Sequence, residues 1–197
     1  MSEKQTTYAI TRTPSLSWSD DVPCSPVDPE CLELLPAGWT NATPYAKFYG
    51  ALGYHTGVDM NLNTPTWDLD RNAPVYSVLP GACIFAGKAR GKSWGGLIVI
   101  LHRWNDFVFC TRYGHVSINS IAVLVGEQIK RGEQIARIGL YGGSNPNYHL
   151  HFDIGKNDLL LRDPASWETK TAEIVKENYH DPFWLYAHKY AKTETQK

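Results

Sequence analysis

The sequence predicts an all-β core, an antiparallel β-sandwich that carries an irregular N-terminal leader and a short helical C-terminal tail. Between Tyr54 and Ile154, short apolar runs are separated by Gly, Pro and Asn, a spacing that is typical of an antiparallel sandwich. The first 45 residues are rich in Pro, Ser, Asp and Cys and show no periodicity. At 197 residues, one domain is expected. We divide it into a leader (1–45), a core (46–156) and a C-terminal extension (157–197).

Six strands are expected in the core, each marked by a short apolar run. The first two flank Pro80-Gly81, a dipeptide that is typical of a turn. The last lies in "YHLHFDI", where aromatic and branched residues alternate with polar ones, as in many strands. The six predicted ranges are Val75–Leu79, Ala82–Ala86, Leu97–Leu101, Phe107–Tyr113, Ile135–Ile138 and His149–Ile154.

The character of the sequence changes after Ile154. Two segments, "DPASWETKTAEIVKENY" and "DPFWLYAHKYAK", are expected to be helical. In the second, Asp181 is the expected N-cap and Pro182 the first helical residue, because proline is favoured at that position. This tail is expected to pack against the sandwich.

Two short segments about ninety positions apart, "HTGVD" and "HLHFDI", carry the residues with the clearest chemistry, namely His55, Asp59, His149 and His151. Imidazole and carboxylate are the ligands of zinc sites that keep a reactive position open. His55, Asp59 and one histidine of the HxH pair supply three ligands. The other histidine then stays beside the metal, where proton transfer needs it.

The expected local structure supports this site. In a strand, side chains two residues apart point the same way, so His149, His151 and Asp153 share one face and the apolar residues between them share the other. Gly57 is expected to give a loop the freedom to turn His55 and Asp59 towards one point. Asp153 either accepts a hydrogen bond from a ligand histidine or, in the interpretation we favour from sequence, is an exposed strand residue or a partner for Lys or Arg.

The ordered motifs "HxxxD", "YGH" and "HLHF" resemble the lysostaphin/LytM-type zinc metalloendopeptidases, which cut peptidoglycan cross-links. The resemblance runs from about Tyr54 to Ile154 and includes "APVYSVLPGACIFAG", "WGGLIVILH" and "VLVGEQIKRGEQIARIG". It implies a sandwich of the duplicated-hybrid-motif type, one Zn²⁺ ion and a peptidoglycan peptide as substrate. Carried over by position, the resemblance implies zinc ligands His55, Asp59 and His151 and catalytic histidines His115 and His149.

Several alternatives stay open at this stage. The same fold serves a non-catalytic regulator, or a zinc-binding signalling module without turnover. Relatives of the first kind usually lose metal or catalytic residues, whereas this chain keeps all of them. The sequence does not say which of His115 and His149 is the base. Glycyl bridges and D-alanyl–diaminopimelate cross-links are both possible substrates.

Composition excludes several other functions. Lys+Arg number 19 against 20 Asp+Glu, without a basic run, which argues against a nucleic-acid partner. The longest apolar stretch, "GLIVIL", is too short to span a membrane. The N-terminus lacks the apolar segment of a signal peptide. An envelope or extracellular site of action is expected, by an export route that the sequence does not reveal, and the protein is expected to be a monomer.

The cysteines do not settle the redox compartment. Cys24 and Cys31 flank "SPVDPE", and a small disulfide loop between them would suit an oxidising location. Cys83 and Cys110 lie in predicted strands and are expected to be buried thiols. The histidines outside the motifs, including His102, are expected to be ordinary core or surface residues.

Overall fold

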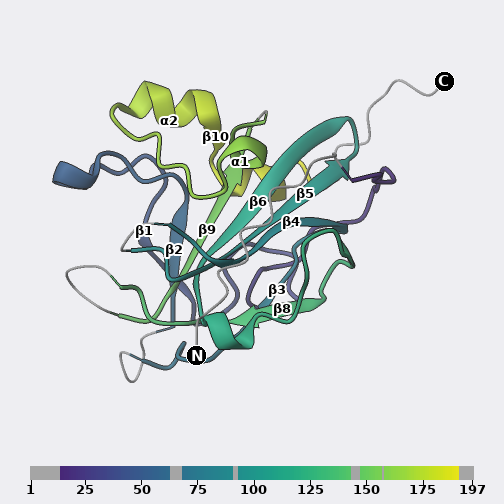
Figure 1. Ribbon diagram of the computed structural model, residues 1–197, viewed down its shortest axis with the longest axis horizontal. Coiled ribbons are helices and arrows are strands. Elements are labelled where there is room, and N and C mark those ends of the chain that lie inside the picture. The colour runs from purple at the N-terminus through teal and green to yellow at the C-terminus, as the bar shows by residue number, and fades with distance from the viewer. Residues whose placement is uncertain (1–13, 63–67, 91–92, 143–146, 157, 191–197) are drawn as a thin grey trace, which may run out of the picture.

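The fold is a large antiparallel sheet with a second layer on each face, as Figure 1 shows for the computed structural model. The structure describes residues 14–62, 68–90, 93–142, 147–156 and 158–190. The large sheet has the strand order β1-β2-β9-β6-β5-β4-β7, and β10 also pairs with β9. A two-stranded sheet, β3-β8, packs on one face of it.

The strands and helices have the following bounds. The strands of the large sheet are β1 (Thr40–Thr43), β2 (Val58–Asn61), β4 (Gly81–Lys88), β5 (Gly96–Trp104), β6 (Phe107–Val116), β7 (Gln128–Ile129), β9 (Leu150–Gly155) and β10 (Tyr179–His180). The small sheet contains β3 (Pro74–Tyr76) and β8 (Gln134–Arg137). The helices are α1 (Leu159–Arg162), α2 (Ala172–Asn178) and α3 (Phe183–Ala187), with short 3-10 turns at Gly50–Leu52 and Ile118–Ser120. No helix in the described ranges has the length and apolar character needed to cross a membrane.

Strand β5 lies inside the sheet, between β6 and β4, and is buried on both faces. Ile98 and Ile100 join the core beneath the small sheet. Leu97 and Val99 join a second core, to which helices α1 and α2 contribute Leu160 and Val175. The unbroken apolar run "GLIVIL" is therefore what a strand covered on both sides requires.

The predicted fold class is confirmed, with differences in detail. Strands form at all six predicted places, although the predicted strand Val75–Leu79 ends already at Tyr76. Leu150, Phe152 and Ile154 of β9 are buried in the core as their alternation requires. The second sheet of the sandwich is small: among the described residues it contains only β3 and β8. Strand β2 was expected to be a loop, but its alternating Val58 and Met60 enter the core while it pairs with β9.

The C-terminal extension is less helical than the sequence predicts. In the first of the two segments, only α2 is helical, and the chain then enters β10. In the second, α3 begins at Phe183, one residue later than expected, with Pro182 at the N-cap position. The Asp181 carboxylate nevertheless accepts the hydrogen bond from the Phe183 backbone N–H, at 3.1 Å, so its capping function is retained.

The leader also differs from the expected irregular wrap. Its last residues form β1, which pairs with β2, and Leu34 belongs to the main core. Cys24 and Cys31 are both free thiols, so the disulfide that the sequence allowed is absent. The Cys24 thiol instead lies 3.4 Å from the carbonyl oxygen of Ser77. The limits of the three segments remain a prediction.

His102 is a core residue whose ring is fully enclosed by the sheet. Its Nδ1 lies 2.8 Å from the carbonyl oxygen of Pro80 and its Nε2 lies 2.7 Å from the Thr111 hydroxyl. Burial lowers the pKa of His102 from 6.5 to about 4. Between these two pH values the unfolded chain binds more protons at this position than the folded chain does.

We expect His102 to make the free energy of unfolding fall as the pH drops from about 6.5 to about 4, by up to about 3 kcal/mol. The stability that neutral His102 contributes is fully present above its pKa of 6.5 in the unfolded chain. It is lost as the pH falls towards its pKa of about 4 in the folded chain. Urea unfolding of the wild type and His102→Gln across this range measures the effect. The stability difference between them should shrink as the pH falls, and a constant difference would show that His102 does not titrate in this way.

Candidate active site

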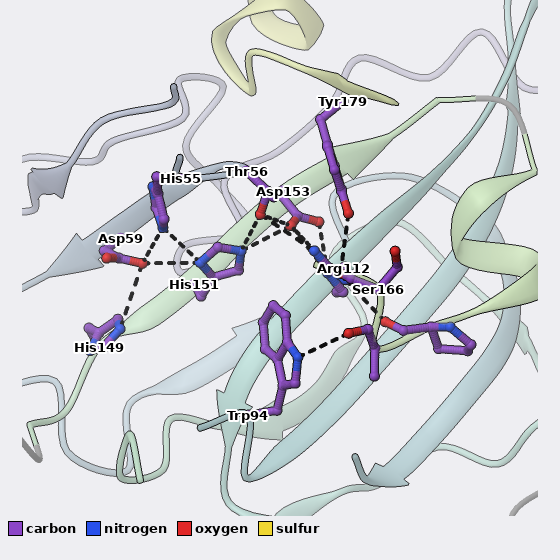
Figure 2. A network of polar contacts seen from close by, with 12 residues as sticks. His55, Thr56, Asp59, Trp94, Arg112, His149, His151, Asp153, Ser166 and Tyr179 are labelled. Atoms are coloured by element: carbon purple, nitrogen blue, oxygen red, sulfur yellow. Dashed lines mark hydrogen bonds and ion pairs between the residues drawn. The ribbon is translucent and has the colours of Figure 1, made fainter. Parts of the chain in front are cut away.

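Strands β2 and β9 bring together the two histidine-containing motifs from opposite ends of the core sequence. Asp59 on β2 lies directly opposite His151 on β9 in the antiparallel register. His55 precedes β2 and turns its ring towards both, as Figure 2 shows. Gly57 makes this possible by lack of volume, because a Cβ atom there would lie 2.1 Å from the carbonyl oxygen of Phe152 on β9. The expected role of Gly57 as a flexible loop residue is thus replaced by close strand packing.

Three ligand atoms converge at this point. His55 Nε2 lies 3.1 Å from Asp59 Oδ1 and 3.0 Å from His151 Nδ1, and the last two atoms are 3.2 Å apart. Ligands bonded to a tetrahedral zinc at about 2.0–2.1 Å are separated from one another by about 3.3 Å. All three residues are buried, and this group of three is the one potential metal-holding cluster that the described residues form. Its size and donor types therefore suit a zinc ion.

The tautomers of the two histidines suit it as well. His55 Nδ1 lies 3.3 Å from the carbonyl oxygen of Pro44, which can only accept, so the proton is on Nδ1 and the Nε2 lone pair faces the cluster. His151 Nε2 lies 3.0 Å from Asp153 Oδ2. The carboxylate accepts a hydrogen bond from Nε2–H, and in this tautomer the Nδ1 lone pair faces the cluster. Outer partners of this kind set the orientation of metal-binding histidines.

The charge of Asp59 is stabilised where a cation would sit. Burial alone would raise the pKa of this carboxyl group. When the inward nitrogens of His151 and His55 carry protons, their hydrogen bonds and charge outweigh burial and hold the pKa well below its ordinary value; a cation bound to the neutral rings would replace those protons. Asp59 is therefore ionised at neutral pH. An ionised carboxylate between two imidazole lone pairs forms a donor set that a divalent cation neutralises.

His115 and His149 form a second pair beside this cluster. Their ring centroids are 4.6 Å apart, and His149 Nε2 lies 3.6 Å from Asp59 Oδ1. His149 Nδ1 is held by the Asn147 side-chain oxygen at 2.7 Å, and His115 Nδ1 by the carbonyl oxygen of Trp94 at 3.2 Å. Both rings thus carry their proton on Nδ1 and have Nε2 available for substrate or water.

Burial makes both of these histidines neutral at ordinary pH. It lowers the pKa of His149 to about 4, and it lowers the pKa of His115 well below its usual value, with the neighbouring histidines adding to the effect. A neutral imidazole can accept a proton from water and pass it on. His115 also has a φ of 64°, a left-handed conformation that non-glycine residues adopt at some energetic cost, often at functional sites.

Aromatic rings enclose the cluster. The Trp94 ring stacks on His115 with centroids 5.7 Å apart and meets His151 edge-on at 5.2 Å. Trp167, from the C-terminal extension, lies 6.2 Å from the His55 ring and 5.8 Å from the His151 ring. The two tryptophan rings therefore pack directly against three of the site histidines.

The structure brings together all five residues predicted for the site, while their individual roles stay predictions. The expectation that Asp153 is exposed is wrong. It is fully buried, it accepts a hydrogen bond from His151, and it pairs with Arg112. Asp153 is therefore both the acceptor behind a histidine and the partner of an arginine, two interpretations that the sequence left as alternatives. Sequence reasoning missed Arg112 and Trp167. Arg112 had one signal, a charge in the aromatic strand "FVFCTRYGH", whereas Trp167 had none.

Comparison with known proteins agrees with this geometry. The model of peptidase family M23 matches residues 53–162. Lipoprotein NlpD of Yersinia enterocolitica is 33% identical over 95 residues, which are 47% of this chain and 90% of that protein. The catalytic domain of the antimicrobial peptidase lysostaphin from Staphylococcus simulans superposes with a TM-score of 0.55 at 24% identity, covering 76% of this chain and 92% of that domain. Another lysostaphin structure gives a TM-score of 0.54, with coverage of 81% and 54%.

The match to lysostaphin, at this level of identity, shows a shared fold. The family model carries more weight, since it spans more than half of the chain and contains all five residues predicted for the site. The chain therefore belongs to peptidase family M23.

Proposed function

We propose that the protein is a zinc-dependent endopeptidase that hydrolyses the peptide cross-links of bacterial peptidoglycan. The observation that carries the proposal is the buried triangle of His55, Asp59 and His151, with both imidazole lone pairs directed inwards. A zinc ion held there would polarise a substrate carbonyl and make water a stronger nucleophile at neutral pH. The remaining chemistry falls to the side chains beside the triangle.

His115 and His149 are suited to the proton transfers. One neutral imidazole accepts a proton from the attacking water through its Nε2. The other stabilises the oxyanion that develops on the carbonyl, or returns a proton to the leaving amine. Their rings lie 4.6 Å apart on one side of Asp59, so both can reach the same scissile bond. The assignment of base and acid between them is open.

The substrate class follows from the family and from the motifs shared with lysostaphin-type enzymes. Peptidoglycan lies outside the cytoplasm, so the proposed place of action is the cell envelope or the extracellular space. The proposal includes a single polypeptide chain as the active unit, because all five proposed site residues come from one chain.

The test is digestion of purified peptidoglycan with the zinc-loaded protein, followed by mass spectrometry of the released muropeptides. We expect cleavage of peptide cross-links, loss of cleavage with a chelator and recovery when zinc is restored. The masses of the products would distinguish glycyl bridges from D-alanyl–diaminopimelate bonds. Zinc binding without any released muropeptide would favour the non-catalytic alternative on the same fold.

Metal analysis provides a separate prediction. We expect about one zinc per chain after purification from metal-replete medium, because the described residues contain one set of three ligands. Elemental analysis of the intact protein measures the ratio. If the folded protein, purified from metal-replete medium, contained no zinc, His55, Asp59 and His151 would not be zinc ligands.

A further inference from the structure

Residues 164–167, which follow the family-matched part of the chain, reach back over the active face of the large sheet. We call them the 164–167 segment. Three consecutive backbone carbonyls of this segment accept hydrogen bonds from side chains near the site. Pro164 and Ser166 accept from Arg112 Nη1 at 3.2 and 2.7 Å, and Ala165 accepts from Trp94 Nε1 at 3.3 Å. The contacts can be followed in Figure 2.

Arg112 is completely buried and uses its whole guanidinium group. Its Nη1 binds the 164–167 segment, and its Nε donates to Asp153 Oδ1 and Oδ2, each at 3.1 Å. Its charge also lies over the rings of Trp94, at 4.4 Å, and Tyr179, at 5.5 Å. Arg112 on β6 and Asp153 on β9 are directly opposite each other in the register, so the pair occupies a fixed place in the sheet.

Asp153 connects this ion pair to the metal triangle. Its Oδ2 accepts from the Thr56 hydroxyl at 2.6 Å and lies 3.0 Å from His151 Nε2. His151 faces the triangle with its other nitrogen, Nδ1. A continuous path therefore runs from backbone carbonyls of the 164–167 segment through Arg112 and Asp153 to a proposed ligand atom.

Stability is a weak explanation for this arrangement. Burying two charges carries a desolvation cost, and apolar residues of similar volume often replace a buried ion pair without loss of stability. The pair does, however, fix the ring plane and the tautomer of His151. A carboxylate behind a metal-binding histidine typically changes metal affinity by about 10–100-fold.

We propose that the 164–167 segment, Arg112 and Asp153 form a positioning relay for the metal ligand His151, so that the C-terminal extension is part of the metal centre. Asp153 orients His151, Arg112 orients Asp153, and the carbonyls of Pro164 and Ser166 orient Arg112. None of these groups takes part in the reaction itself. The proposal rests on the proposed metal site, and its test is a binding measurement that does not depend on turnover.

The principal variant is the double replacement Arg112→Leu with Asp153→Leu in the full chain. It removes the ion pair without leaving either charge unpaired. We expect zinc affinity, measured by competition with a chromophoric chelator, to fall about 10–100-fold. The melting temperature of the metal-free protein should stay close to that of the wild type. Unchanged zinc affinity would overturn the relay.

Arg112→Lys covers the possibility that the double variant does not fold. Lysine keeps a positive charge for Asp153, but its single nitrogen cannot hold the carboxylate and two carbonyls together. We expect a smaller, several-fold loss of zinc affinity. Thr111→Val is the matched control, because Thr111 is adjacent on β6 and its hydroxyl bonds to His102 and Tyr113 in the core. That variant should lose stability and keep wild-type zinc affinity.

A third comparison isolates the 164–167 segment. In this variant, glycine replaces Pro164, Ala165 and Ser166 together, and Trp167 is retained. The backbone carbonyls remain, but the backbone that carries them becomes more flexible. Zinc affinity should fall in the wild-type background and change little further in the double-leucine background, since the relay is already broken there. Equal losses in both backgrounds would show that the segment does not act through Arg112. A wild-type protein that binds no zinc would instead refute the proposed function itself.

Discussion

Replacing Asp59 and His151 together with alanine is expected to abolish zinc binding and, with it, the cleavage of peptidoglycan. The double variant keeps His55 as the one remaining member of the triangle, and a single imidazole does not retain zinc against a chelator. Both side chains are buried and bonded chiefly to each other and to other groups of the site. The loss should therefore come from the missing ligands, with the backbone pairing of β2 and β9 still available.

The measurement is zinc content per folded chain, alongside release of muropeptides. Circular dichroism of the variant establishes that it folds. His188→Ala serves as the control, because His188 bonds to the backbone oxygen of Trp184 in α3, away from the triangle. Full zinc content in the double variant would show that the metal, if present, is held elsewhere.

Alanine at His115 or at His149 should have the opposite signature, with zinc retained and turnover lost. Neither replacement removes a member of the triangle. Each removes a neutral imidazole whose Nε2 is available to water or substrate, and general acid–base catalysis typically contributes about 10²–10⁴-fold. We expect the rate of muropeptide release to fall by about that factor in each variant while zinc content stays near that of the wild type.

The two results together check the assignment of the HxH pair. His149→Ala should keep its zinc and His151→Ala should lose it. The reverse outcome would mean that the two histidines have exchanged roles. Near-wild-type cleavage by either His115→Ala or His149→Ala would remove that residue from the proposed chemistry.

Much of the site could be predicted because its residues lie in local patterns. The alternation in β9 places His149, His151 and Asp153 on one face from sequence alone, and the structure has them there. The sequence pattern places Asp59 in a loop because Gly57 is typical of turns, whereas the alternation of Val58 and Met60 marks β2 as a strand.

The contacts that Arg112 makes with Asp153 and with the 164–167 segment could not be predicted from the sequence. Whether Arg112 meets Asp153 depends on the register between β6 and β9, which side-chain types in one strand do not fix. The 164–167 segment acts through backbone carbonyls, and every residue has one. Nothing in "DPASW" therefore distinguishes a segment that binds a buried arginine from an ordinary connection, and its expected helix does not form.

The leader and helix α3 meet each other in the main core. The Tyr186 hydroxyl in α3 donates to the carbonyl oxygen of Cys24 in the leader, at 2.8 Å, and Leu34, Leu185 and Tyr186 share one core with Phe152. An expression clone cut at the limits of the family match, 53–162, would remove all of these groups except Phe152 and leave apolar surface open to aggregation. Anyone who transplants the proposed catalytic unit into a chimeric protein should carry residues 14–190 across as a single piece.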